Sequence, residues 1–317
     1  MLRTLFTRGS ASFFSIALLI TMVFIMAHLP PGGPAFSILG VKATPASVAA
    51  INSRLGLSVP LWQQYFIYWG HLFTGNLGNS YLLNRPVAQL LGAYFINTIA
   101  FYSISILVSV ICAILVGLVQ GVYYGRWPAR VIDLYQMAFY SLPSFFVGTL
   151  LIMLFSVKLG WLPASGIVDV RDVHPGVSSF AAHLVLPVIT VALVTTAGLS
   201  RYFGEAVHEE LGKEYVRTAA AKGVSFSAIL FTHVLKNALR PLVTILGLSF
   251  PYIFTGGVTV ETVFDYPGLG WLMWRSALER DYPVLIAIVL IIGVLTVLGN
   301  FLADLVNGLL DPRARYE

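Results

Sequence analysis

Long apolar runs separated by short polar or turn-rich stretches follow one another along the whole chain. Six of these runs contain no Asp, Glu, Lys or Arg: residues 11–29, 98–124, 134–157, 184–200, 242–260 and 284–303. A helix that rises 1.5 Å per residue needs about 20 residues to cross a hydrocarbon layer about 30 Å thick. The pattern therefore predicts an all-α membrane protein with six transmembrane helices.

Charge supports this interpretation and predicts an orientation. Of the 317 residues, 57% are hydrophobic and 10% are charged, which excludes an ordinary water-soluble domain. The basic residues are scattered between apolar runs rather than gathered on one face, so nucleic-acid binding is excluded as well. With both termini on the same side, twelve of the nineteen basic residues lie there: Arg3, Arg8, Arg126, Arg130, Arg201, Lys213, Arg217, Lys222, Lys236, Arg240, Arg313 and Arg315. Because cytoplasmic loops are enriched in Lys and Arg, both termini are predicted to be cytoplasmic.

The six runs divide the chain into three parts. Residues 1–29 form a cytoplasmic N-terminus and first span, which is too long for a cleaved signal peptide and lacks a small-x-small cleavage site. Residues 30–97 form an extracytoplasmic segment, and residues 98–317 a five-span core. The single cysteine, Cys112, excludes an internal disulfide and a cysteine-clustered metal site.

Prolines and glycines inside the runs indicate bends and close packing. Pro143, Pro187 and Pro251 each remove a backbone donor and tend to kink a helix, which suits a bundle that changes shape. Simple bending without a functional role is an equally good interpretation of these prolines. Three glycines repeat every four residues along one face of the second run and predict close helix contact: Gly117, Gly121 and Gly125.

The extracytoplasmic segment contains one strongly aromatic stretch, residues 61–73. Its Trp and Tyr residues suit a short helix lying at the membrane interface. An aromatic platform for carbohydrate is the alternative, and interface anchoring is favoured over it.

The connection between the fourth and fifth runs, residues 201–240, contains most of the charge-dense sequence. Acidic and basic residues alternate through a good helix former until Gly223, and a second amphipathic pattern leads to Pro241. This predicts a helix, a turn and a second helix. The turn, residues 218–223, is rich in alanine, so it could insert into a groove on a partner and transmit a rigid-body movement. A solvated amphipathic connector is the alternative that these residues alone leave open.

Residues 214–223 and 233–241 together resemble the cytoplasmic "EAA" loop of ATP-binding-cassette importer permeases, and more narrowly the dipeptide, oligopeptide and nickel permease family. Further motifs of that family occur in the same order along nearly the whole chain: residues 55–65, 75–80, 85–87, 260–264, 267–270, 280–284 and 310–313. Each motif is weak alone, but their joint order and spacing make chance agreement improbable.

The resemblance implies a type I importer permease fold in a bacterial or archaeal inner membrane, and it implies partners. These are a homologous second permease that completes the translocation pathway, two ATPase subunits and an extracytoplasmic solute-binding protein. The residues expected to dock an ATPase are Tyr215, Val216, Arg217, Thr218, Ala219, Ala220, Ala221, Lys222 and Gly223. Arg217 stands where many sugar and amino-acid permeases have the motif glutamate, so Glu214 is not assigned that glutamate's salt bridge.

Catalytic, cofactor-binding and metal-binding residues are not expected. The chain lacks the Gly-x-x-x-x-Gly-Lys-Ser/Thr phosphate loop, so ATP and Mg²⁺ are expected on the partner ATPases. Glu261 and Asp265 could contact the solute or the binding protein, although a role in capping local turns is favoured. A secondary transporter or channel is the main alternative. The charge-free runs argue against this alternative, because coupled ion movement usually needs charged residues within the membrane. Di- or oligopeptides are the expected cargo, and the sequence does not select among peptides, glutathione, nickel chelates and oligosaccharides.

Overall fold

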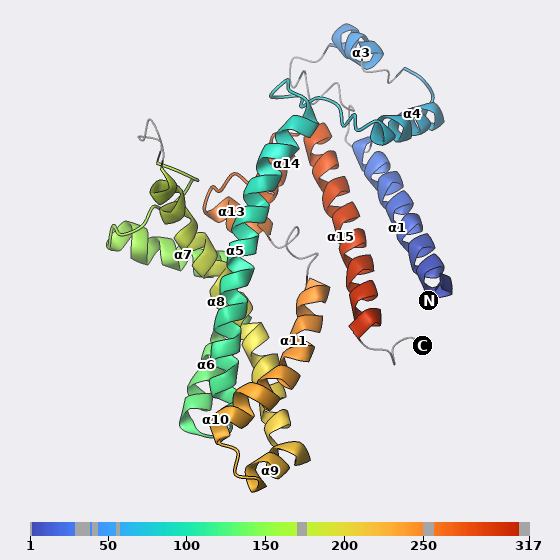
Figure 1. Ribbon diagram of the computed structural model, residues 1–317. Helices are drawn as coiled ribbons and strands as arrows, with labels where there is room; N and C mark the ends of the chain where they lie inside the picture. The colour runs from blue at the N-terminus through green and yellow to red at the C-terminus, as the bar shows by residue number, and fades with distance from the viewer. Residues whose placement is uncertain are drawn as a thin grey trace. The chain divides into compact units, whose positions relative to one another are not determined.

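The computed structural model describes residues 2–28, 39, 44–54, 58–169, 176–249 and 257–310, and every named element in these ranges is a helix. Most of the long runs predicted from the sequence correspond to helices (Figure 1). In chain order the helices are α1 (Leu2–His28), α3 (Pro45–Arg54), α4 (Leu61–Phe73), α5 (Val87–Val122), α6 (Trp127–Ser141), α7 (Ser144–Leu151), the π-helix η2 (Ile152–Lys158), α8 (Val177–Leu211), α9 (Glu214–Ala221), α10 (Phe226–Ile229), the π-helix η3 (Leu230–Val234), α11 (Leu235–Ser249), α13 (Gly257–Val263), α14 (Leu269–Leu278) and α15 (Tyr282–Leu310).

Within the described residues, four helices are long and apolar enough to cross a membrane, at residues 9–26, 87–122, 177–211 and 282–301. The expected third span is not one helix, because α6 and the α7–η2 pair meet at an angle of 105°. Pro143 lies at this break, as the N-cap of α7, where its missing N–H removes no helical hydrogen bond. If the bent pair is one span, the described residues contain five.

Pro187 differs from Pro143 in its effect on the helix. Pro187 lies inside the unbroken helix α8, so it does not end that helix as Pro143 does. The expected fifth span, residues 242–260, is described as α11 up to Ser249 and α13 from Gly257. Pro251 lies outside the described residues, as do the family motif residues 55–57 and 311–313.

The chain divides into two compact units. Unit 1 comprises residues 1–98 and 267–317, and in it α1 packs along α15 (Figure 1, blue and red). Gly293 of α15 makes this approach possible, since a Cβ there would lie 2.2 Å from Leu19 of α1. The aromatic stretch forms α4 over the range expected, and its Tyr65 hydroxyl lies 2.8 Å from Thr21 Oγ1 of α1. Its position at a membrane interface stays a prediction.

Unit 2 comprises residues 99–266 and is built around α8. The predicted glycine face of α5 packs directly on α8: a Cβ at Gly117 would lie 2.7 Å from Ser200 O, and one at Gly121 would lie 2.6 Å from Val207 Cβ. The prediction that Gly125 belongs to this face is wrong. This glycine follows the end of α5 with φ +76° and has open space around it, so its role is to allow the turn toward α6.

Candidate functional site

The α9 segment, defined as Lys213–Gly223, contains the predicted alanine-rich turn, residues 218–223. Its helix α9 follows directly on α8, which continues to Leu211, well past the expected end of the fourth span at Ser200. Glu214 occupies the first turn of α9, where a negative charge interacts favourably with the helix dipole. Gly223 ends the helix with φ +79°, and its N–H donates to Ala220 O at 3.0 Å. A helix, a turn and further helices are present, as predicted, with two differences. The first helix is broken at Gly212 and Lys213, between α8 and α9, and residues 218–221, predicted as part of the turn, belong to α9.

The two faces of α9 have different surroundings. Val216 and Ala219, three residues apart, pack on a hydrophobic core formed mainly by α8, η3 and α11. The opposite face is exposed and consists of Arg217, Thr218, Ala220 and Ala221. Ala219 is thus part of the inner support, while the small residues open to a partner are Ala220 and Ala221.

Tyr215 fastens the start of α9 to its neighbours. Its hydroxyl donates to Glu210 Oε2 at 2.5 Å and accepts from Asn237 Nδ2 of α11 at 3.3 Å. Lys213 Nζ lies 2.5 Å from the other oxygen of Glu210. Partial burial, together with the bond to Glu210, raises the pKa of Tyr215, and the hydrogen bond to Glu210 raises the pKa of Lys213. Tyr215 therefore stays protonated, as it must be to donate.

Exposed ion pairs cover the rest of this region, in the pattern that the alternating charges predict. Arg217 Nη1 lies 2.9 Å from Glu214 Oε1, with the two side chains 71% and 85% exposed. Arg201 and Glu205 form a similar exposed pair on α8 at 3.5 Å. Pairs of this kind contribute about 0–1 kcal/mol, so they do not fix the shape of the segment. The inner face and Tyr215 do that.

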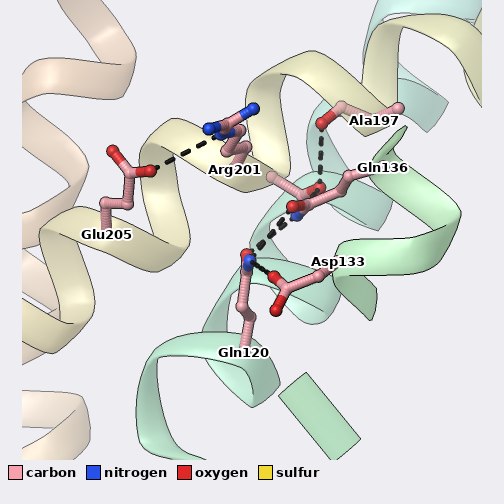
Figure 2. Close-up of polar contacts among 7 residues, drawn as sticks. Gln120, Asp133, Gln136, Ala197, Arg201 and Glu205 are labelled. Atoms are coloured by element: carbon pink, nitrogen blue, oxygen red, sulfur yellow. Dashed lines mark hydrogen bonds and ion pairs between the residues drawn. The ribbon is translucent and has the colours of Figure 1, made fainter. Parts of the chain in front are cut away.

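A polar cluster between α5, α6 and α8, buried except for Asp133, was not predicted from the sequence. Gln120 Nε2 donates to Gln136 Oε1 at 3.0 Å and to Asp133 Oδ1 at 2.7 Å (Figure 2). In return Gln136 Nε2 donates to Gln120 Oε1 at 2.8 Å and to Ser200 Oγ at 3.0 Å. The cluster lies beside a cleft of about 900 Å³ that Arg201 and Glu205 also line. Gln120 and Gln136 lie inside otherwise apolar runs, and this feature of the sequence could have predicted the cluster.

Glu261 and Asp265 do not form one exposed acidic pair. Glu261 lies in α13 and is fully buried in unit 2, whereas Asp265 is exposed and adopts φ +47° in the turn after α13. The Asp265 N–H donates to Thr262 O at 3.2 Å, which places Asp265 in a turn, while a capping role for its side chain stays a prediction. A contact of either residue with a solute or a binding protein stays a prediction.

Two of the short motifs, 200 residues apart, meet within unit 1. Ser80 Oγ donates to Asp281 Oδ2, and the Tyr81 N–H donates to Asp281 Oδ1 at 3.0 Å. Ser80 Oγ also accepts from the Leu83 N–H at 2.9 Å. Ser80 and Asp281 are both buried, at 2% and 3% exposure. We call this arrangement the Ser80–Asp281 clasp. It joins the segment before α5 to the start of α15.

Several membrane-length apolar helices in the described residues define an integral membrane protein. Comparison with known families gives the class: residues 113–316 match the family described as "Binding-protein-dependent transport system inner membrane component", and residues 1–111 match its N-terminal counterpart. The chain belongs to this family, and it is an inner-membrane permease of the dipeptide and oligopeptide type of ABC transporter.

Individual relatives match nearly end to end. A probable peptide ABC transporter permease protein, y4tP of Sinorhizobium fredii, is 38% identical over 93% of each chain. The glutathione transport system permease protein GsiC of Salmonella choleraesuis is 34% identical over 96% of this chain and 95% of its own. GsiC of Escherichia coli K12 is 34% identical over 93% of each.

Proposed function

We propose that the chain is the permease subunit of an ATP-driven importer of di- or oligopeptides, and that residues Tyr215 to Gly223 of the α9 segment dock a separate ATPase. It pairs with a homologous second permease to form the translocation pathway, and an extracytoplasmic binding protein delivers the solute. Two ATPase subunits bind ATP and Mg²⁺, while this chain has no catalytic residue and no cofactor. Family membership and the names of the relatives support this assignment.

The observation that carries the docking proposal is the division of α9 into two faces. A helix that receives force must be held on one side and accessible on the other. Val216, Ala219 and Tyr215 hold α9 to α8, η3 and α11, and the opposite face is exposed and has small side chains at Ala220 and Ala221. A partner surface can therefore close over that face, and displacement of α9 is passed to α8 through a packed core.

The proposed topology has six spans and both termini in the cytoplasm, so that the α9 segment faces the ATPases. The excess of basic residues on that side supports this orientation. Labelling of single cysteines with a membrane-impermeant reagent tests it in a Cys112→Ser background. Cysteines at Ala220 and at Gly9 are expected to react only from the cytoplasmic side, and one at Trp62 only from the other side. Reaction of the Ala220→Cys and Trp62→Cys variants from the same side would overturn the topology.

Docking is tested in the assembled complex of both permeases, the ATPases and the binding protein. In a Cys112→Ser background, an Ala220→Cys variant is expected to cross-link to the ATPase. Ala220→Trp is expected to abolish uptake of trialanine and of glutathione, because it adds bulk to the docking face without entering the core. Ala228→Trp places the same bulk on an exposed residue of α10 and is the matched control.

The outcomes separate the parts of the proposal. Absence of the cross-link together with normal uptake by the Ala220→Trp complex would overturn docking through α9. Uptake that continues on an ion gradient after ATP is removed would overturn the ATP-driven mechanism. Uptake of glutathione but not of trialanine would show that the cargo is glutathione rather than peptides in general.

A further inference from the structure

The buried amide pair Gln120–Gln136 has features that simple helix packing does not require. Both side chains are almost fully buried, at 6% and 4% exposure, and each amide both donates to and accepts from the other. Apolar residues could pack these helices equally well, whereas a reciprocal amide pair is satisfied in only one register. Separation of the helices would leave buried donors and acceptors without partners. The pair therefore resists small displacements of α6 along α5 and α8.

The pair also lies on a continuous path from α9. Val216 and Ala219 of α9 pack in the same hydrophobic core as Leu199, Phe203 and Val207 of α8. Ser200, within that stretch of α8, accepts from Gln136 of α6. Gln136 in turn precedes the end of α6 at Ser141, where the chain bends by 105° into α7. A movement of α9 that displaces α8 thus reaches α6 through this hydrogen-bonded contact.

Gly204 makes the arrangement specific. A Cβ at Gly204 would lie 2.4 Å from Gln120 Oε1 and 3.0 Å from Gln120 Cδ, so only glycine leaves room for this amide. An added methyl group would push the Gln120 side chain away from Gln136 while leaving both glutamines in the sequence. The structure therefore offers a way to break the pair without removing either member.

We propose that Gln120 and Gln136 are positioning residues of the transport cycle, which make α6 move as one body with α8 when the α9 segment is displaced. The proposal rests on the proposed docking function of α9. It assigns these residues no contact with solute. It predicts that the separation of α6 and α8 is independent of the nucleotide state, and that this independence is lost when the amide pair is broken.

Spin labels at Val131 of α6 and Tyr202 of α8, both exposed, measure that separation in the assembled complex. The native cysteine is first replaced by Cys112→Ser, and double electron–electron resonance is recorded without nucleotide and with a non-hydrolysable ATP analogue. With the amide pair intact, the two distance distributions are expected to coincide. In Gln136→Leu they are expected to differ between the two states, or to broaden in one of them.

Two further variants keep the result interpretable. Gly204→Ala is expected to reproduce the effect of Gln136→Leu, and it serves if the leucine variant does not assemble. Gln89→Leu, an exposed glutamine on the same helix as Gln120, is the control and is expected to leave the distributions coincident. A nucleotide-dependent separation with the amide pair intact would overturn the proposal, and so would coincident distributions in both broken variants.

Failure of this proposal can be told apart from failure of the proposed function. The Ala220→Cys cross-link to the ATPase is measured in the same preparation. If the cross-link forms while breaking the amide pair changes nothing, only the positioning role is wrong. If the cross-link does not form and the Ala220→Trp complex takes up solute normally, docking through α9 is wrong, and the positioning proposal falls with it.

Discussion

In the Ser80–Asp281 clasp a buried carboxylate accepts two hydrogen bonds, whereas on α9 the carboxylate of Glu214 is exposed and pairs with Arg217. The clasp cannot exchange its partners at little cost, because Asp281 is buried and a hydrogen bond lost there is not replaced by one to water. The exposed pair can exchange its partner for water or for a group on another protein at little cost. The comparison indicates that unit 1 contains a junction built for fixed geometry, while the outer face of α9 is a surface left available for a partner.

Removal of the clasp carboxylate should produce the largest effect. In Asp281→Ala the Ser80 hydroxyl and the Tyr81 N–H lose their acceptor, which should cost about 2–4 kcal/mol of local stability. Hydrogen exchange at the backbone amides of Tyr81 and Leu83 should then accelerate by roughly thirtyfold to several-hundredfold. Glu279→Ala removes an exposed carboxylate from the same unit and should leave these rates unchanged. Equal rates in both variants would show that the clasp does not hold this segment.

The inner face of α9 should behave like a core rather than like the surface on its other side. Val216→Ala removes two methyl groups that pack against the hydrophobic core, which should cost about 1–2 kcal/mol. Exchange at the amides of Ala220 and Gly223 should accelerate accordingly. Val224→Ala is the matched control, since Val224 is exposed just beyond the segment. An equal effect of the two variants would contradict the two-faced description of α9.

The Tyr215 hydroxyl should contribute less than the packed face does. Tyr215→Phe keeps the ring but removes the bonds to Glu210 and Asn237, and a net loss of about 1 kcal/mol is expected for a half-buried hydroxyl. Hydrogen exchange along α9 measures it, with Tyr202→Phe, an exposed tyrosine of α8, as the control. No difference between these variants would mean that α9 is held by Val216 and Ala219 alone.

The sequence predicted regions whose cause is local and missed those whose cause is a distant contact. Residues 61–73 form a helix over the predicted range, and residues 214–217 are helical as predicted, because periodicity and charge spacing act within a few turns. Residues 218–221, predicted as part of the turn, continue the second of these helices. The break at Pro143 was expected only as a kink, since a charge-free run does not reveal where its helix ends. The Ser80–Asp281 clasp joins residues 201 positions apart, and the Gln120–Gln136 pair joins two different helices, so the partners in both follow only from tertiary packing.

Loss of the exposed Arg217–Glu214 pair on α9 should have the smallest effect. Arg217→Ala breaks the bond to Glu214, but both side chains are mostly solvated, so the stability of α9 should change by no more than about 0.5 kcal/mol. Exchange at the amide of Ala220 should stay within about a factor of two of its normal rate, whereas Val216→Ala should exceed that clearly. If Arg217 contacts the ATPase, the same variant should weaken cross-linking from Ala220→Cys while leaving exchange in the isolated permease pair unchanged. A large acceleration of exchange in Arg217→Ala would show instead that the charged face supports the helix, and the distinction between a fixed junction and an available surface would fail.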